Sequence, residues 1–488
     1  MFLKKKKQPF IQEGKKKPPR DNRENREIGH ITYIFVGLFL ALIGYLMYFT
    51  QFKSSELINN SYNTRQELLA EKVVRGSILS RDRQVLAKTE IASDGSETRS
   101  YPYENLFAHA VGYSTHGKTG VESIANFTLL TSNAFIGERV KNDIDEIKNP
   151  GDSVVTTLDV DIQKAADDAM GVYKGAIVVM NVKTGEILAL VSKPDFDPNQ
   201  INSIWEEVNE DSQNSVLLNR ATQGLYPPGS TFKIVTALEY IKENSDVSNY
   251  SFDCTGSFER GDSIINCYHG QSHGHVDFMT SFAKSCNSSF ANISTMLNKK
   301  AFQKTCRELL FNGALPVPYT YRESYVPVSA SSDTDEVMQT GIGQGKTQIT
   351  PIHMTLITAA IANDGILMKP YVISSVENEN KDVIKSYHPQ EYGRLVEEAD
   401  ALALQELMAE VVQSGTATKV RETSGYVAAG KTGSAEYSSV KTESHAWFSG
   451  FAPVSDPEIA VTVILEGAGS GGDYAVPMAK RVFDAYFN

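Results

Sequence analysis

Residues 219–233 read Asn219-Arg-Ala-Thr-Gln-Gly-Leu-Tyr-Pro-Pro-Gly-Ser-Thr-Phe-Lys233, and no other stretch says as much about the fold. The Pro-Pro-Gly run at residues 227–229 is incompatible with a helix, whereas the residues after it are apolar nearly all round a helical turn. We therefore predict a buried helix over residues 231–242 that Ser230 opens. Lys233 is the only charged side chain in its first two turns, and a spacing of three residues places it on the side of the serine.

Ser230 and Lys233 have the chemistry of a nucleophile and its base. A lysine in apolar surroundings loses its preference for the charged form, so it can accept a proton near neutral pH. A serine at a helix start has backbone N–H groups and the positive end of the helix dipole close to any oxyanion that forms there. The S-x-x-K pattern is weak alone, because Ser281–Lys284 and Ser438–Lys441 also match it, although neither follows a Pro-Gly turn into a buried helix.

Two further motifs follow along the chain. Ser285-Cys286-Asn287 matches S-x-N, and Lys431-Thr432-Gly433-Ser434 matches K-T-G directly before a pair of predicted strands. Only one selection gives S-x-x-K, S-x-N and K-T-G in this order, with a strand pair and a closing helix after the last, and this combination is a strong signal. Isolated copies of the second and third patterns occur at residues 61–63, 212–214, 118–120 and 183–185.

Elsewhere the sequence predicts short strands on both sides of a mainly helical middle. Residues 75–87 have the pattern of a hairpin, and Asp161 is placed to cap a helix that ends at Met170. Strands from both ends of the chain then have to share one sheet, which describes an α+β domain. Those strands are expected at residues 175–182, 186–192, 445–453 and 458–465, with a closing amphipathic helix at residues 476–486.

Length, composition and charge limit the alternatives. A chain of 488 residues is expected to form two or three domains, and 41% apolar with 22% charged residues excludes collagen-like and disordered chains. Residues 1–30 hold ten Lys and Arg against four acids, so a tail of +6 leaves −18 on the rest of a chain whose net charge is −12. The acidic body is unsuited to nucleic acid, whereas the basic tail suits a membrane surface.

A membrane anchor is predicted directly after this tail. Residues 28–52 contain no charged side chain, and the apolar run is long enough to cross a bilayer, which needs about 20 residues. Its length, and the lack of a small-x-small site after it, disfavour a cleaved signal peptide. We expect a basic cytoplasmic tail at residues 1–28, a transmembrane segment at residues 29–52 and the acidic bulk of the chain outside the cytoplasm.

The cysteines and histidines around residue 260 pose a separate question. Cys254, Cys267, His269, His273 and His275 have the donor types of a zinc site. Structural zinc usually has ligand pairs two to four residues apart, and Cys254 and Cys267 are too far apart in the sequence for such a pair. We therefore expect a structural loop and no metal site. A Cys254–Cys267 disulfide stays open as an alternative, because an extracytoplasmic domain permits one.

With its anchor and three motifs, the chain resembles the class B penicillin-binding proteins, the membrane-anchored D,D-transpeptidases of peptidoglycan synthesis. The resemblance covers the anchor and nearly all of residues 74–488. It implies a penicillin-binding or serine β-lactamase-like fold over residues 151–488, in which an antiparallel sheet has helices on both faces and a helical subdomain beside it. Residues 53–150 are short for the family, so they would form a stalk and a reduced pedestal. Further matching stretches are Arg75–Ile78, Thr157–Gln163, Gly343–Gly345, Ser414–Ala417 and Ala446–Ala452.

The resemblance also implies roles for the first two motifs. In this family the S-x-x-K serine is acylated, which implies that Ser230 is the nucleophile and that Lys233 takes its proton. Ser285 would relay a proton toward the leaving group, and Asn287 would hold the substrate amide.

The third motif would bind the end of the substrate. By the same resemblance Lys431 and Thr432 would face its terminal carboxylate. Gly433 would belong to the same substrate-binding stretch and precede Ser434. The backbone N–H groups of Ser230 and Ser434 would form the oxyanion hole. No cofactor and no metal are implied.

The function that the resemblance implies is cross-linking of peptidoglycan stem peptides through an acyl-Ser230 intermediate, with β-lactams as inhibitors. A D-Ala-D-Ala carboxypeptidase is the closest alternative, since only the acceptor differs. A penicillin-sensing receptor is disfavoured because the cytoplasmic tail has no room for an effector domain, and a secreted β-lactamase is disfavoured by the anchor. Residues 54–150 are too few for a glycosyltransferase, which implies a polytopic membrane glycosyltransferase as partner.

Overall fold

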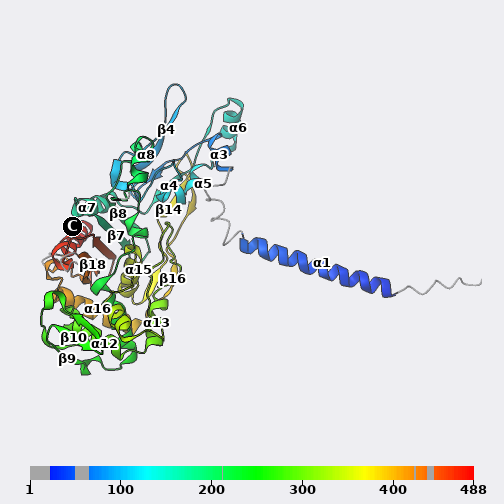
Figure 1. Cartoon of the computed structure of the whole chain (residues 1–488). Coiled ribbons are helices and arrows are strands. Elements are labelled where there is room, and N and C mark those ends of the chain that lie inside the picture. The colour runs from blue at the N-terminus through cyan, green and yellow to red at the C-terminus, as the bar shows by residue number, and fades with distance from the viewer. Residues whose placement is uncertain (1–21, 50–64, 212, 422–424, 437–443) are drawn as a thin grey trace, which may run out of the picture. The chain divides into compact units, whose positions relative to one another are not determined.

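The structure is a computed structural model that describes residues 22–49, 65–211, 213–421, 425–436 and 444–488, in two units that divide after residue 63. The first unit contains helix α1 (Asn22–Tyr48) (Figure 1). Within α1, residues Ile28–Tyr48 have a mean hydropathy of 2.0 and are long enough to cross a membrane. This agrees with the predicted anchor, whose expected end at residue 52 lies outside the described residues, as does the basic tail up to residue 21.

The second unit is built around a five-stranded antiparallel sheet in the order β17-β18-β19-β7-β8. The hairpin β7–β8, the pair β18–β19 and the closing helix confirm the sequence-based prediction. Strand β17, which carries the K-T-G motif, was not predicted, because its glycines and alanines have low strand propensity. The strands are β7 (Gly175–Asn181), β8 (Ile187–Lys193), β17 (Ala429–Glu436), β18 (Ser444–Ala452) and β19 (Ile459–Leu465).

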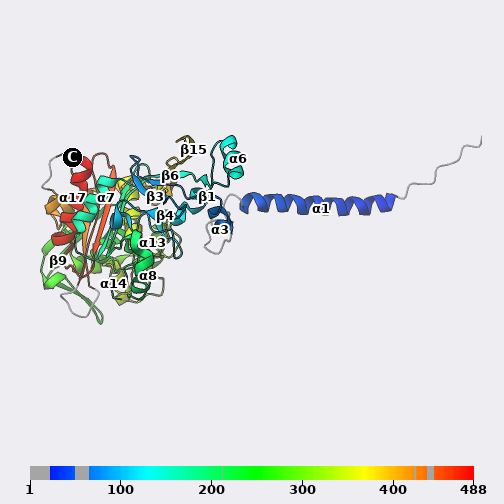
Figure 2. The same ribbon diagram turned by 90° about the horizontal axis from the view of Figure 1, so that it is seen from above.

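Helices cover both faces of this sheet, as expected for the fold class. Helices α7 (Val160–Met170) and α17 (Val476–Phe487) pack against each other and over β7, β8, β18 and β19 (Figure 2). The apolar helix α15 (Pro351–Ala362) covers the other face, where Thr358 hydrogen-bonds Ser449 of β18. Asp159 caps α7 by accepting from two backbone N–H groups, so the cap predicted at Asp161 is wrong by two residues.

A helical subdomain lies beside the free edge at β17. Its helices α10 and α12 are central, and two pairs of short strands, β9–β12 and β10–β11, lie against α12. The helices are α10 (Lys233–Glu243), α11 (Phe278–Ala283), α12 (Asn287–Met296), α13 (Lys299–Glu308), α14 (Thr334–Gly341) and α16 (Glu398–Gln413). The short helix α9 (Arg220–Gln223) packs instead against α15, β7 and β8. The short strands are β9 (Ser251–Cys254), β10 (Ser257–Arg260), β11 (Ser263–Asn266) and β12 (Gly274–Asp277).

A second sheet has six strands in the order β15-β14-β6-β2-β3-β4, and four of them come from the N-terminal part of this unit. The predicted hairpin at residues 75–87 is present as β2 and β3. Strands β6 and β14 come from beyond residue 150, so the predicted division there separates the sequence but not this sheet. Its strands are β2 (Ile78–Leu79), β3 (Val85–Ile91), β4 (Glu97–Ser100), β6 (Ser153–Thr156), β14 (Ile373–Glu377) and β15 (Val383–Ser386).

The remaining elements are short and connect these layers. Near the second sheet they are α3 (Arg65–Ala70), β1 (Val73–Val74), α4 (Gly120–Ile124), α5 (Asn126–Leu129), α6 (Ile136–Ile144) and β5 (Asn149–Pro150). Further along the chain they are α8 (Ile201–Glu210), β13 (Ile366–Met368) and β16 (Glu391–Arg394).

Candidate active site

Ser230 lies in a 3₁₀ turn, η4 (Gly229–Phe232), that leads directly into α10. The predicted buried helix is therefore present, with a tighter first turn. Gly229 has a φ of +54°, and a Cβ there would lie 3.0 Å from both Ala435 Cβ and Ser434 O. Glycine thus gives the turn its left-handed backbone and also lets it approach β17 closely.

Lys233 is fully buried at the start of α10. Its Nζ donates to the backbone oxygen of Ser285 and to Oδ1 of Asn287, both at 2.7 Å, and lies 3.4 Å from Ser285 Oγ. Burial lowers the pKa of Lys233 to about 8, although the nearby Cys286 and Cys267 side chains act in the opposite direction. A lysine with this pKa exists in part as the neutral amine near neutral pH, so it can take a proton from a hydroxyl.

Ser285 connects the two lysines of the site from the loop between α11 and α12. Its hydroxyl accepts a hydrogen bond from Lys431 Nζ at 2.8 Å, while its backbone oxygen accepts from Lys233. Its φ of +56° is a conformation that costs a non-glycine residue roughly 1–2 kcal/mol. Such a residue persists only where its surroundings hold it, and it is often found at functional sites.

Asn287 is fixed at both ends of its side chain. Its Oδ1 accepts from Lys233, and its Nδ2 donates to the backbone oxygen of Asn266, at 3.0 Å, at the end of β11. The amide is therefore oriented by one partner on α10 and another at the end of β11.

Lys431 is fully buried on β17, and its Nζ also donates to the backbone oxygen of Thr432 at 3.0 Å. Burial lowers its pKa well below the ordinary value, and the charge of Lys233 lowers it further. Two adjacent buried ammonium groups repel each other, so loss of a proton from one of them is favoured.

Gly433 and Ser434 lie where β17 meets the η4 turn. A Cβ on Gly433 would be 2.9 Å from the backbone oxygen of Pro228 and 3.1 Å from Trp447 Cβ. The amide of Gln344 pairs with the backbone N–H and C=O of Glu436, each at 3.2 Å, so the backbone groups of Glu436 point off the free edge of the sheet. Because strand residues alternate, those of Ser434 point off the same edge, toward η4.

A cleft of about 860 Å³ brings residues of all three motifs together. Ser230, Ser285, Asn287, Thr432 and Ser434 line it. Lys233, Lys431 and Gly433 are buried behind this lining. The ammonium group of Lys431 bonds Ser285 Oγ behind this lining, and its expected role at a substrate carboxylate stays a prediction.

Several cleft residues were given no role by the sequence. Asn266, Gln339, Gln344 and Thr416 all line the cleft. Thr416 Oγ1 lies 2.5 Å from Thr432 Oγ1, so two hydroxyls stand together beside the K-T-G strand. The Ser414–Ala417 stretch was a signal for Thr416, but the spacing alone could not show that it reaches β17.

The structure also bears on the other two S-x-x-K matches and on the four cysteines. Ser281 is fully buried in α11 and hydrogen-bonded to Ser289, whereas Ser438 lies outside the described residues. The four cysteines are free, so the Cys254–Cys267 disulfide that was left open is not formed. Three of them nevertheless cluster with His273 in a set that could hold a metal ion, at the place where the sequence favoured a structural loop.

Comparison with known families gives two matches. The penicillin binding protein transpeptidase domain matches residues 175–484, and the penicillin binding protein A dimerisation domain matches residues 75–154. The second match begins within the predicted pedestal and ends four residues after it.

Relatives and solved structures agree with these families. The peptidoglycan D,D-transpeptidase PbpA of Mycolicibacterium smegmatis is 30% identical, over 82% of this chain and 87% of the relative. The peptidoglycan D,D-transpeptidase MrdA of Acinetobacter baumannii is 29% identical, over 79% and 66% respectively. The penicillin G acyl-enzyme complex of penicillin-binding protein A from M. tuberculosis superimposes with a TM-score of 0.77 and 29% identity, covering 86% of this chain and all of the other.

Proposed function

The chain belongs to the penicillin binding protein transpeptidase family as a class B member and is a peptidoglycan D,D-transpeptidase, and on this basis we propose that Ser230 is its acylated nucleophile. The observation that carries this proposal is the meeting of three distant motifs in one cleft, with Ser285 hydrogen-bonded to both buried lysines. β-Lactams acylate the same hydroxyl in this proposal.

The first half-reaction forms the acyl-enzyme. Ser230 Oγ attacks the carbonyl carbon between the two terminal D-Ala residues, and its proton passes to neutral Lys233. The backbone N–H groups of Ser230 and Ser434 stabilise the oxyanion. The carbon–nitrogen bond then breaks, and the leaving D-Ala amine takes a proton from the Ser285 hydroxyl, which Lys431 replenishes.

The second half-reaction transfers the acyl group. The amine of a neighbouring stem peptide attacks the ester carbonyl, and its excess proton passes through Ser285 to Lys431. The ester carbon–oxygen bond then breaks, and Lys233 returns its proton to Ser230 Oγ. A cross-link is the product when an amine attacks, and a shortened peptide when water does. The Asn287 amide holds the donor peptide, and the hydroxyls of Thr432 and Thr416 bind its terminal carboxylate.

The test uses the detergent-solubilised full chain and a fluorescent penicillin. Ser230→Ala is expected to abolish covalent labelling, whereas the matched variant Ser281→Ala, at the buried decoy serine, is expected to retain it. Labelling that survives Ser230→Ala with a folded protein would identify a different nucleophile. Mass spectrometry of products from lipid-linked substrate separates cross-linking from carboxypeptidase activity.

The membrane arrangement is part of the proposal. An apolar helix near the N-terminus suggests a membrane anchor. We infer a cytoplasmic N-terminus from the ten basic residues that precede it, and hence an extracytoplasmic active site. The substrate then has to be polymerised nearby, so we propose a polytopic membrane glycosyltransferase as partner. The test places one cysteine at residue 10 or at an exposed site such as Val172 and treats intact cells with a membrane-impermeant thiol label. Labelling at residue 10 and not at residue 172 would refute this orientation.

A further inference from the structure

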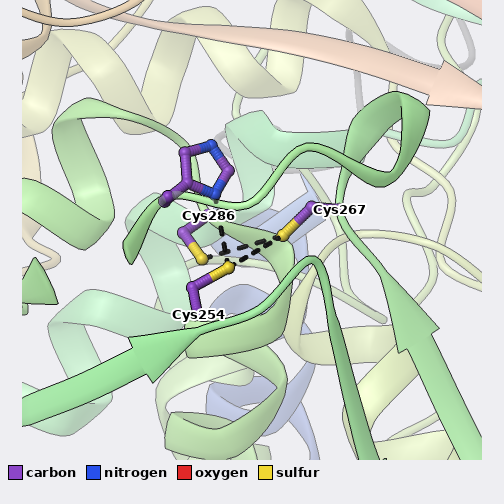
Figure 3. Close-up of side chains that lie close together, drawn as sticks. Cys254, Cys267 and Cys286 are labelled. Carbon is purple, nitrogen blue, oxygen red and sulfur yellow. Dashed lines mark hydrogen bonds between the residues drawn. The ribbon is translucent and has the colours of Figure 1, made fainter. Parts of the chain in front are cut away.

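Three cysteines and one histidine gather next to the active site without taking part in the chemistry described so far (Figure 3). The Sγ atoms of Cys254, Cys267 and Cys286 and one ring nitrogen of His273 all lie within 4.8 Å of one another. The sulfurs of Cys254 and Cys267 are 3.6 Å apart, and those of Cys267 and Cys286 are 3.8 Å apart. His273 Nδ1 lies 3.5 Å from Cys254 Sγ.

These separations are those expected at the corners of a metal-centred tetrahedron. Bonds of about 2.3 Å from zinc to sulfur and about 2.0–2.1 Å to nitrogen place two sulfurs about 3.8 Å apart, and a sulfur and a nitrogen about 3.6 Å apart. Three thiols and an imidazole are donors that suit Zn²⁺ and not the oxygen-binding cations Mg²⁺ and Ca²⁺. Four protein ligands close the coordination sphere, which is typical of a structural zinc site.

The surroundings of the sulfurs suit thiolates. All three cysteines are buried, with at most 3% of their surface exposed, in a small cluster of their own with Phe252. The backbone N–H of Ser288 points at Cys267 Sγ at 3.5 Å, and that of Ser289 at Cys286 Sγ at 3.4 Å. Because both N–H groups belong to the first turn of α12, the positive end of the helix stabilises negative sulfur there.

The fold assembles this set by strand pairing and not by close spacing in the sequence. The β10–β11 hairpin pairs Ser257 with Asn266, which places its flanking residues Cys254 and Cys267 near each other. The β9–β12 pair sets Cys254 opposite Gly274, next to His273. The spacing rule that argued against zinc describes ligands on one tight turn, so it does not apply to ligands at the ends of paired strands.

We propose that Cys254, Cys267, His273 and Cys286 bind one structural Zn²⁺ ion that holds the S-x-N motif in position. Binding displaces the protons of the three thiols to solvent, and the metal keeps its oxidation state. His269 and His275, which were the other candidates in the sequence, lie outside the set, and the ring of His275 pairs with Asp253.

The positioning role follows from where the ligands sit. Cys286 lies between Ser285, whose backbone is left-handed, and Asn287, so a metal bond at Cys286 anchors both neighbours. Asn287 also donates to Asn266, the residue before Cys267. Cys267 and His273 bound a loop that lines the cleft. One ion therefore ties together the second motif, its hydrogen-bond partner and one wall of the cleft.

Metal binding is tested first, and its readout does not depend on catalysis. The full chain, purified in detergent without chelators, is expected to contain about one zinc per chain by elemental mass spectrometry. Cys254→Ala and His273→Ala are expected to lose most of it, whereas the matched variants Cys306→Ala, at a buried cysteine outside the set, and His275→Ala are expected to keep it. Zinc retained in Cys254→Ala would overturn the assignment.

Cobalt gives a second readout that needs no variant to fold. Replacement of zinc by Co²⁺ in the unaltered protein is expected to produce the visible absorption of a tetrahedral cobalt–thiolate centre. A protein that holds no zinc and shows no such absorption, or one whose peptide map contains a Cys254–Cys267 disulfide, would overturn the proposal.

The positioning role rests on the proposed function and is tested separately. Removal of zinc with a chelator is expected to slow labelling by fluorescent penicillin by on the order of 10²-fold, the effect of a small displacement of reacting groups. Added Zn²⁺ is expected to restore the rate in the unaltered chain and in Cys306→Ala, but not in Cys254→Ala. An unchanged rate after zinc removal would refute the positioning role. A zinc-loaded chain that never labels would refute the proposed function and leave the metal result standing.

Discussion

At the scale of single residues, the site depends on two lysines that are buried beside one serine. Lys233 and Lys431 are both without exposed surface, and both donate to Ser285. Their mutual repulsion and their burial favour the neutral amine, which a base requires. The hydrogen bonds of the two lysines differ. Lys233 also donates to Asn287, whereas Lys431 donates to Ser285 Oγ and to the backbone oxygen of Thr432 in its own strand.

The pH dependence of acylation follows from Lys233. Its pKa, lowered by burial to about 8, means that the neutral base is the minor form at pH 7 and the major form at pH 9. The rate of penicillin acylation is therefore expected to rise about tenfold per pH unit up to pH 8 and then level off. Stopped-flow measurement between pH 6 and 10 checks this. Lys233→Ala is expected to lower the rate by ~10²–10⁴-fold, and Lys242→Ala, at the exposed end of the same helix, to leave the profile unchanged. A flat profile would exclude Lys233 as the base.

Lys431 provides a second test at this scale. Its sequence context suggested a direct partner for the substrate carboxylate, but its ammonium group is buried and bonded to Ser285. If it acts through Ser285, Lys431→Gln is expected to slow acylation by a β-lactam and by its carboxyl ester in the same proportion. Lys431→Arg, which keeps the charge but changes the shape, is expected to retain more activity than the glutamine variant. A clearly smaller loss with the ester than with the acid would instead support a direct contact between Lys431 and the carboxylate.

At the scale of elements, patterns of apolar residues predicted most strands of the central sheet and the helix that closes the chain. They did not predict which distant segments contact one another. The strands β7, β8, β18 and β19 and the helix α17 were evident because each has a continuous apolar pattern. Strand β17 was not, since Gly430 and Gly433 interrupt any such pattern. These two glycines are required by close contacts with Phe448 and Pro228, which no local property of the sequence reveals. The cysteine cluster was missed for the same reason, since hairpins bring its members together.

Gly433→Ala tests the contact between β17 and the η4 turn. The new Cβ would approach the backbone oxygen of Pro228 at 2.9 Å, so the strand has to move away from the turn that carries Ser230. We expect acylation to slow by on the order of 10²-fold, because the oxyanion donors on the two elements separate. Gly313→Ala is the matched control, since a Cβ there has its nearest neighbour at 3.9 Å. An acylation rate within twofold of the unaltered enzyme would show that this contact does not set the geometry of the site.

At the scale of the whole molecule, the unit from residue 64 to 488 contains a buried ion network that stabilises the fold away from the cleft. The second sheet carries a buried ion network of its own, in which Glu122 bonds Arg75 at 2.6 Å and Arg99 at 2.7 Å. None of these three residues lines the described cleft. The network joins α4 to the chain before β2 and to β4, so it holds together the elements that match the dimerisation domain.

Glu122→Gln is therefore expected to destabilise the protein without changing its chemistry. Glu122 is fully buried, and loss of its charge leaves two guanidinium groups uncompensated, which typically costs ~3–5 kcal/mol. The melting temperature should fall well below that of Glu138→Gln, an exposed control on α6, while the acylation rate of the folded enzyme stays the same. Burial acts to raise the pKa of Glu122, but the two arginines prevail and hold it below the ordinary value. A carboxyl with a lowered pKa stabilises the fold above its unfolded pKa and loses this contribution as the pH falls through the folded one, so the difference between wild type and variant should shrink in acid. A difference that is independent of pH, or a melting temperature equal to that of the control, would show that the buried charge does not hold this sheet together.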